Sequence, residues 1–258
     1  MLNLNGKNAL VTGIANHRSI AWGIAQKLHE AGANLGVNYL PDEKGKHEKK
    51  VKELVEPLNP DFCVPCNVQD DEQVAQMFAT AEQTWGQLDI LVHCLAFAGK
   101  DELSGNFTDL SWEGFARSLE ISTYSLVKLS SAAKPLMKEG GSILTLTYLG
   151  SQRVTPNYNV MGVAKAGLES SVRYLAAEMG PQNIRVNAIS AGPIRTLAAS
   201  AIGGIADMIR HVEEVSPLGR TVTQLEVGNT AVFLSSDLAT GMTGQVVYVD
   251  AGYSVMGL

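Results

Sequence analysis

Residues 144–165 read LTLTYLGSQRVTPNYNVMGVAK, the pattern of a buried strand that ends, a short loop and the start of a helix. Tyr148 stands at the strand end, and Tyr158 and Lys165 are seven residues apart. On a helix of 3.6 residues per turn, this spacing puts both side chains on one face, about 10 Å apart along the axis. A nearby cation lowers the pKa of a phenol toward the working range. The segment indicates a proton donor with an electrostatic helper, although packing of Tyr158 and solvation of Lys165 explain the pattern as well.

Strand and helix patterns alternate on both sides of this segment. Strands are predicted at 7–12, 34–39, 61–65, 88–97, 142–148, 184–190 and 245–249. Helices are predicted from about 19 and at 41–57, 70–85, 111–138, 157–179 and 223–235, the fourth of them interrupted or ended near Pro135. This alternation predicts an α/β fold, with residues 1–258 forming a single Rossmann-like domain around a doubly wound sheet of about seven parallel strands. The run 88–97 is the most continuous apolar strand and is expected in the sheet centre.

Ligands of such sheets bind at the carboxyl ends of the strands, where the strand order switches. Right-handed crossovers place that switch between the first and fourth strands. Gly13, Leu95 and Tyr148 all stand at predicted strand ends. Residues 191–208 are small, apolar and glycine-containing, which is typical of a flexible segment.

Composition limits the classes of function. The chain has 258 residues, 45% hydrophobic and 18% charged, which supports a substantial core and favours oligomerisation. A net charge of −6, with a single basic run at 44–52 on a predicted surface helix, argues against nucleic acid as a partner. No signal peptide is expected, because the polar first residues lead straight into a strand, and no apolar run reaches the roughly 18 residues of a membrane span. A cytoplasmic location is expected.

The cysteines and a strand histidine are predicted to be structural. Cys63 and Cys66 have redox or half-metal-site spacing, but no second Cys/His pair accompanies them, so no metal site is expected. Cys94 and His93 lie in the apolar fourth strand and are expected in the core.

The turn 12–23 joins the first strand to a helix and is a weak candidate for dinucleotide binding. Gly13 lets the backbone approach a pyrophosphate, and the helix start offers N–H groups and a positive dipole end. The spacing differs from the G-x-G-x-x-G fingerprint, and an ordinary loop is the alternative. Neither an acid nor an arginine ends the second strand, which leaves a slight preference for NADH. Asn67 and Val68, after the third strand, either bond and sandwich an adenine or form an Asn turn with a core valine.

Four segments carry a family resemblance: TGIANHRSIAWGIA at 12–25, YLGSQRVTPNYNVMGVAKA at 148–166, RVNAISAGPIRTLAAS at 185–200 and TGQVVYVDAGY at 243–253. They resemble the bacterial and plastid enoyl-acyl carrier protein reductases of the short-chain dehydrogenase/reductase superfamily, over nearly the whole chain. Most of that superfamily carries Tyr-x-x-x-Lys, with a serine thirteen residues before the tyrosine. Here the corresponding positions are Met161 and Tyr148, so the usual carbonyl-reducing triad is absent, and Tyr158 matches the tyrosine of the enoyl reductases.

The resemblance implies reduction of the 2,3 double bond of a trans-2-enoyl thioester on acyl carrier protein, the last step of fatty-acid elongation, by NADH, with NADPH as the alternative. It implies that Tyr158 donates to the developing enolate oxygen, that Lys165 holds the nicotinamide ribose, and that Tyr148 lines the acyl pocket and assists protonation. Ala98, Tyr148 and Tyr158 match substrate contacts. The positions that match cofactor contacts are Gly13, Ser19, Ile20, Leu40, Asn67, Val68, Leu95, Lys165, Ile194, Arg195, Thr196, Leu197 and Ala198.

The resemblance also implies a substrate-binding lid at about 194–210 and a homotetramer. Two departures from relatives stand out: Leu40 replaces a polar contact, and the lid has no basic residue between Thr196 and Ile209. Arg195, Arg210 and Arg220 remain as candidates for docking the acidic carrier, with ordinary surface charge as the alternative. Two competing functions stay open: a carbonyl or hydroxysteroid-type reductase, and a nucleotide-sensing module without catalysis.

Overall fold

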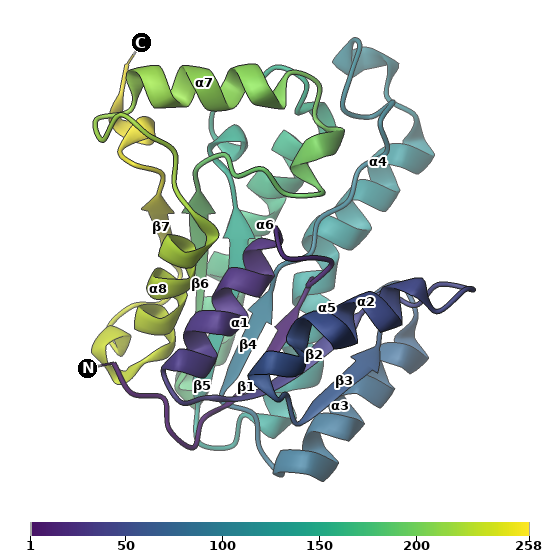
Figure 1. Cartoon of the computed structure of the whole chain (residues 1–258), viewed down its shortest axis with the longest axis vertical. Coiled ribbons are helices and arrows are strands. Elements are labelled where there is room, and N and C mark those ends of the chain that lie inside the picture. The colour runs from purple at the N-terminus through teal and green to yellow at the C-terminus, as the bar shows by residue number, and fades with distance from the viewer. Residues whose placement is uncertain (1, 258) are drawn as a thin grey trace.

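Seven short apolar runs pair in parallel in the order β3-β2-β1-β4-β5-β6-β7, so the order reverses between β1 and β4. The computed structural model describes residues 2–257, and Figure 1 shows helices on both sides of this sheet. The strands are β1 (Asn8–Thr12), β2 (Asn34–Tyr39), β3 (Phe62–Pro65), β4 (Ile90–His93), β5 (Gly141–Thr147), β6 (Ile184–Ala191) and β7 (Val246–Val249). The predicted doubly wound sheet, its seven strands and its switch point are confirmed.

Two apolar layers cover the sheet. One face packs against α1 (Ile20–Glu30), α2 (Lys46–Val55) and α8 (Gln224–Ser235). The other packs against α3 (Asp71–Trp85), α5 (Ser125–Ala133) and α6 (Asn159–Met179). Helices α1 and α8 cross closely because glycines meet there: a Cβ on Gly23 would lie 2.6 Å from the carbonyl oxygen of Gln224. This packing fixes the start of α1 beside the end of β1.

The fourth strand is central, as predicted, but it is shorter than the apolar run 88–97. It pairs with β1 and β5 only over Ile90–His93. Beyond His93 the chain leaves the sheet, and Phe97 becomes 39% exposed. Cys94 and Leu95 still pack against the core on the two faces of the sheet, whereas Ala98 packs against the cluster around Tyr158.

The helix predicted at 111–138 is broken into three parts. They are α4 (Trp112–Leu119), a π-helical turn over Glu120–Tyr124, and α5, which ends before a 3₁₀ turn that contains Pro135. The hydroxyl of Ser122 accepts from the N–H of Phe97, and that of Thr123 donates to the carbonyl of Ala164. The wide turn thus ties this segment both to the loop after β4 and to α6.

One helix is absent from the sequence prediction. Residues 191–208 were predicted to be flexible throughout, but α7 (Ile205–Val215) begins inside that range after Gly204, whose φ is +77°. Figure 1 shows α7 lying beyond the carboxyl ends of β6 and β7. The prediction missed α7 because it extended the small residues and glycines at the start of the segment through the whole of it, although an amphipathic pattern follows them.

No helix among residues 2–257 is long and apolar enough to cross a membrane.

Candidate functional site

Tyr148 is positioned by the end of β5. The strand stops at Thr147, and a 3₁₀ turn over Leu149–Ser151 follows the tyrosine. The phenol reaches toward α7, with its oxygen 3.3 Å from the sulfur of Met208. Burial, followed by the nearby phenol of Tyr253, raises the pKa of Tyr148 to about 12. Tyr148 is therefore a protonated donor that touches the segment predicted as a lid.

Tyr158 lies against Tyr148. Their ring centroids are 5.2 Å apart and the ring planes make an angle of 71°, an edge-to-face contact. Tyr158 is only 7% exposed. Gly150 permits the contact, because a Cβ there would lie 2.6 Å from the Tyr158 ring and 3.1 Å from the Tyr148 ring. The structure thus brings together the two tyrosines that the sequence analysis singled out.

The helical relation predicted between Tyr158 and Lys165 is wrong. Helix α6 begins at Asn159, two residues later than predicted, so Tyr158 is its N-cap and not part of its first turn. Asn157 and Asn159 have positive φ angles of 59° and 26°, which breaks the helical path at the tyrosine. The pKa of Tyr158 is also raised rather than lowered, by burial and then by Tyr148, and Lys165 is not among the causes. A buried phenol needs a much closer cation for the opposite effect.

Lys165 points at the sheet. Its ammonium nitrogen donates to the carbonyl oxygen of Leu146 at 2.7 Å, and its side chain is buried. Burial lowers the pKa of Lys165 to about 8, while Cys94 and Glu169 act in the opposite direction. An ammonium has three donors, so two remain for other acceptors such as ribose hydroxyls. Lys165 thus binds the end of β5, two residues before Tyr148.

An apolar cluster surrounds the two tyrosines. Leu103, Tyr158, Met161 and Ala164 form its buried part. The partly buried members packed against it are Ala98, Leu119, Tyr148, Ala201 and Ile202. This composition suits a hydrocarbon chain, and it includes Ala98, the predicted substrate neighbour. Met161 cannot donate a proton. Its sulfur instead accepts a hydrogen bond from the hydroxyl of Ser122, at 3.7 Å.

The turn after β1 fits a pyrophosphate. Gly13 has a φ of +91°, and a Cβ there would lie 2.1 Å from the carbonyl oxygen of Cys94, so the position requires glycine. The hydroxyl oxygen of Ser19 accepts from the N–H groups of Ala15 and Asn16, which leaves its hydrogen as a donor. The first turn of α1 has no acidic side chain, so its positive end is available to an anion.

The other predicted cofactor residues line the same edge of the sheet. Leu40, directly after β2, is 54% exposed. The side chain of Asn67 accepts from the N–H of Gln69 in an Asn turn, and Val68 is buried in the core. Ile194–Ala198 follow β6 and lead into the segment before α7, where Thr196 accepts from the N–H of Ala199. The side-chain oxygens of Asn67 and Thr196 each already accept one hydrogen bond within the protein. A ligand would therefore bind to the remaining polar atoms of these residues.

His93 and the cysteines have structural surroundings. The ring nitrogens of His93 lie 2.8 Å from the Thr145 hydroxyl oxygen and 2.7 Å from that of Ser125. Burial, followed by Lys165, lowers the pKa of His93 to about 3, so the ring is neutral. The cysteines are free thiols, and within residues 2–257 no group of His, Cys, Asp and Glu could hold a metal ion. The prediction that His93 is a satisfied core residue is confirmed.

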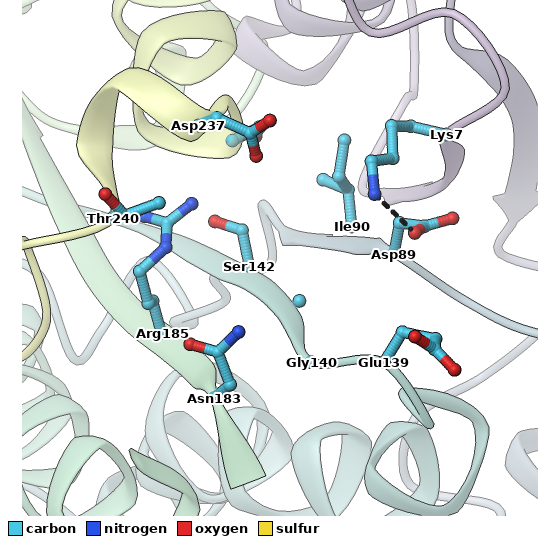
Figure 2. A pocket seen from close by; sticks show the side chains of 12 residues that line it. Lys7, Asp89, Ile90, Glu139, Gly140, Ser142, Asn183, Arg185, Asp237 and Thr240 are labelled. Atoms are coloured by element: carbon cyan, nitrogen blue, oxygen red, sulfur yellow. Dashed lines mark hydrogen bonds and ion pairs between the residues drawn. The ribbon is translucent and has the colours of Figure 1, made fainter.

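A separate hollow opens at the opposite edge of the sheet, by the amino ends of β4, β5 and β6. Figure 2 shows its lining, in which Lys7 and Asp89 form an ion pair of 3.1 Å and Arg185 and Asp237 approach from other elements. None of the predicted site residues lines it. The candidate site is therefore the carboxyl-end cluster around Tyr148 and Tyr158.

Comparison with known proteins shows the family of this chain. The sequence pattern of the family described as enoyl-(acyl carrier protein) reductase matches residues 13–254. This chain belongs to that family. The enoyl-acyl carrier protein reductases (NADH) of Nostoc sp. and Synechocystis sp. are 74% and 68% identical to it over 258 residues, covering each chain completely.

Solved enoyl-acyl carrier protein reductases share the whole fold. The enzyme from Aquifex aeolicus has a TM-score of 0.96 at 47% identity, with both chains fully covered. The Bacillus cereus enzyme, solved with NADP⁺ and indole naphthyridinone, has a TM-score of 0.96 at 51% identity, again over both full chains. The enzyme from Anaplasma phagocytophilum, solved with NAD, has a TM-score of 0.94 at 48% identity and covers 100% of this chain and 97% of that one. The resemblance stated from sequence motifs is confirmed.

Several neighbours of the site in this enoyl-acyl carrier protein reductase were missed from the sequence. Leu103 and Leu119 come from segments far from 144–165 in the chain, and no local motif marks them. Met161 was noted only as a residue that cannot donate. Its apolar spacing with Ala164 and Leu168 along α6 was the available signal.

Proposed function

We propose that this chain reduces the 2,3 double bond of trans-2-enoyl thioesters carried by acyl carrier protein, with NADH as the reductant, in fatty-acid synthesis. The observation that carries the proposal is the buried Tyr158 phenol, held against Tyr148 inside an apolar cluster beside the carboxyl end of β5. Family membership and the NADH-dependent names of the close relatives support it.

NADH supplies a hydride to the β-carbon of the enoyl group when it is bound. Tyr158 donates a hydrogen bond to the thioester oxygen as negative charge develops there, because its pKa keeps the proton on the phenol. The apolar neighbours Leu103 and Met161 keep water away from that oxygen, which strengthens the hydrogen bond. Tyr148 lines the acyl pocket, and its protonated phenol assists delivery of the proton that the α-carbon of the enolate takes up to complete the reduction.

The cofactor is held by the turn after β1, by Lys165 and by residues 194–198. Gly13 and the start of α1 accommodate the pyrophosphate, and Ser19 offers a hydroxyl proton. Lys165 binds the ribose hydroxyls with the donors that Leu146 leaves free. Leu40, Asn67, Val68 and Leu95 border the adenosine side, Leu40 through packing or backbone. NADPH is the alternative reductant, and its rate of oxidation is to be compared with that of NADH.

The segment 194–210 acts as a lid over the acyl chain. It is tied to the site by Met208, next to the Tyr148 phenol, and by Gly203, whose carbonyl accepts from Asn157 at 2.8 Å. Of the three arginines considered for carrier docking, Arg210 pairs with Asp207 and Arg220 with Glu226. Arg195 is exposed and has no ion pair within residues 2–257, so it is the candidate that faces the carrier.

The assembly is a homotetramer, and the enzyme is cytoplasmic. Aromatic side chains on the outer surface of α4, the π-helical turn and α6 support the assembly, with Trp112 74%, Tyr124 55% and Tyr174 78% exposed. A shallow hollow beside Tyr174 is lined in part by Val127, Gly167 and Leu175. Exposed apolar surface of this kind marks contact with another protein surface.

The function is tested by following NADH oxidation with a short or longer enoyl thioester, and in parallel with ketone and aldehyde substrates. Rapid oxidation with enoyl thioesters and little with carbonyl substrates is expected. Good reduction of ketones with untouched enoyl thioesters would favour the carbonyl reductase. NADH binding without turnover of any enoyl thioester would favour a nucleotide-sensing module.

A further inference from the structure

Glu169 is a buried carboxylate that the proposed reaction does not use. It is 6% exposed and lies on α6, four residues after Lys165 and so on the same face of the helix. Glutamate is almost never fully buried unless it is paired, since burial of an unpaired charge is costly. Its partners therefore indicate what it does.

The partners of Glu169 flank Tyr148 in the sequence. One carboxylate oxygen, Oε1, accepts from the hydroxyl of Thr147 at 2.7 Å and from that of Ser151 at 2.5 Å. Thr147 is the last residue of β5, and Ser151 ends the 3₁₀ turn that follows Tyr148. The carboxylate thus closes the turn by bonding both of its ends, with charge-assisted hydrogen bonds that are stronger than neutral ones.

Helix α6 contacts the end of β5 at a second point. The ammonium of Lys165 donates to the carbonyl of Leu146, one residue before Thr147. Between them, Lys165 and Glu169 hold residues 146, 147 and 151. Tyr148 is carried by this held segment, and its ring packs on Tyr158, which starts the same helix.

We propose that Glu169 is a positioning residue: its carboxylate ties Thr147 to Ser151 so that Tyr148 stays against Tyr158, and its charge stabilises the ammonium of Lys165, which lies one turn earlier on the same face of α6. This inference rests on the proposed function, because the tyrosines are assigned there to the substrate. Glu169 itself touches neither tyrosine through a hydrogen bond and acts through its neighbours.

The charges around Lys165 support the second role. Three titratable groups face it: His93 and Cys94 from β4 and the loop after it, and Glu169 from α6. The pKa of His93 is about 3 and that of Cys94 about 12, both because of burial, so neither is charged near pH 8. Glu169 is then the negative charge that acts on the ammonium. From β7, Tyr248 faces Glu169, and its pKa is raised by burial and by that carboxylate.

The two roles separate by substitution. Thr147→Val with Ser151→Ala removes the hydroxyls and keeps the charge, whereas Glu169→Gln keeps an acceptor oxygen and removes the charge. Glu82→Gln is the matched control, because it makes the same change on an exposed glutamate of α3, away from the site and the proposed contact between copies. Thermal melting of every variant shows whether it is folded, and Ser151→Ala alone is the milder variant should the pair fail to fold.

We expect the hydroxyl variants to lower kcat roughly tenfold or more with little change in NADH affinity, since small misplacements at a site cost on the order of 10²-fold. We expect Glu169→Gln to move the alkaline loss of NADH binding, followed by fluorescence, to lower pH. An unchanged kcat in folded hydroxyl variants, or an unmoved alkaline limb in Glu169→Gln, overturns the respective role. Absence of enoyl turnover in the unsubstituted protein instead refutes the proposed function, while the binding measurement still tests the charge of Glu169.

Discussion

The edge of one tyrosine ring meets the face of another at the centre of this site: Tyr148 and Tyr158 lie 5.2 Å apart between centroids, at 71°. One stands at the end of β5 and the other at the start of α6, and Gly150 in the intervening turn leaves room for both rings. The relation fixes where a phenol proton can be offered to a substrate. It also makes the glycine a sensitive position.

Gly150→Ala is predicted to impair the site more than the fold. The new methyl group would lie 2.6 Å from the Tyr158 ring, so one of the two rings must move. Overpacking of this kind costs about 1–3 kcal/mol of stability, and the displaced phenol should lower kcat roughly tenfold or more. Steady-state kinetics with an enoyl thioester and thermal melting measure the two effects. Gly180→Ala is the control, because a Cβ at Gly180 has no atom within 4 Å; equal effects of both changes contradict the packing argument.

Lys165 is predicted to set the alkaline limit of NADH binding. Its pKa is lowered to about 8, whereas the phenol of Tyr148 titrates near 12 and that of Tyr158 higher still. NADH affinity should therefore fall as pH rises through about 8, as the ammonium loses its proton. Lys165→Met should bind NADH weakly at all pH values and lack this limb, while Lys50→Met, on the surface, should keep it. A limb that persists in Lys165→Met would assign it to another group.

The lowered pKa of Lys165 also makes the free energy of unfolding depend on pH. Between about pH 8 and the ordinary lysine value near 10.5, the unfolded chain holds more protons at this position than the folded one. The contribution of Lys165 to the free energy of unfolding should therefore rise with pH across that window and be flat below it. Comparison of denaturant unfolding of the unsubstituted protein and Lys165→Met at pH 7 and pH 10 isolates it. A difference between the two proteins that does not change with pH is incompatible with a buried, titrating lysine.

Tyr174→Glu is predicted to break the assembly. The side chain is 78% exposed on α6 beside an apolar hollow, so a carboxylate there would be buried or repelled in a contact between copies. Light scattering after size-exclusion chromatography should show a tetramer for the unsubstituted chain and smaller species for the variant. Leu238→Glu, equally exposed outside this surface at 71%, should leave the tetramer intact. A monomer in every sample rules out the proposed assembly.

Most of the sheet could be predicted from the sequence, because the apolar pattern of a strand and the residues at its end are local signals. Gly13, Leu95 and Tyr148 were placed at the correct edge for this reason. Tyr158 was placed inside a helix because nothing local reveals that Asn157 and Asn159 adopt left-handed backbone angles. Glu169 was not singled out from the sequence, since the hydroxyls that pair with it come from residues 18 and 22 positions earlier in the chain.

The most direct test of the central claim is kcat for an enoyl thioester, measured beside NADH affinity, in the unsubstituted protein and in Tyr158→Phe. This change removes one oxygen from a buried ring and leaves its packing on Tyr148 in place. The account predicts a loss of kcat on the order of 10²-fold or more with NADH affinity unchanged, as expected for loss of a donor to developing negative charge. An unchanged kcat, or an equal loss of NADH binding, would contradict it.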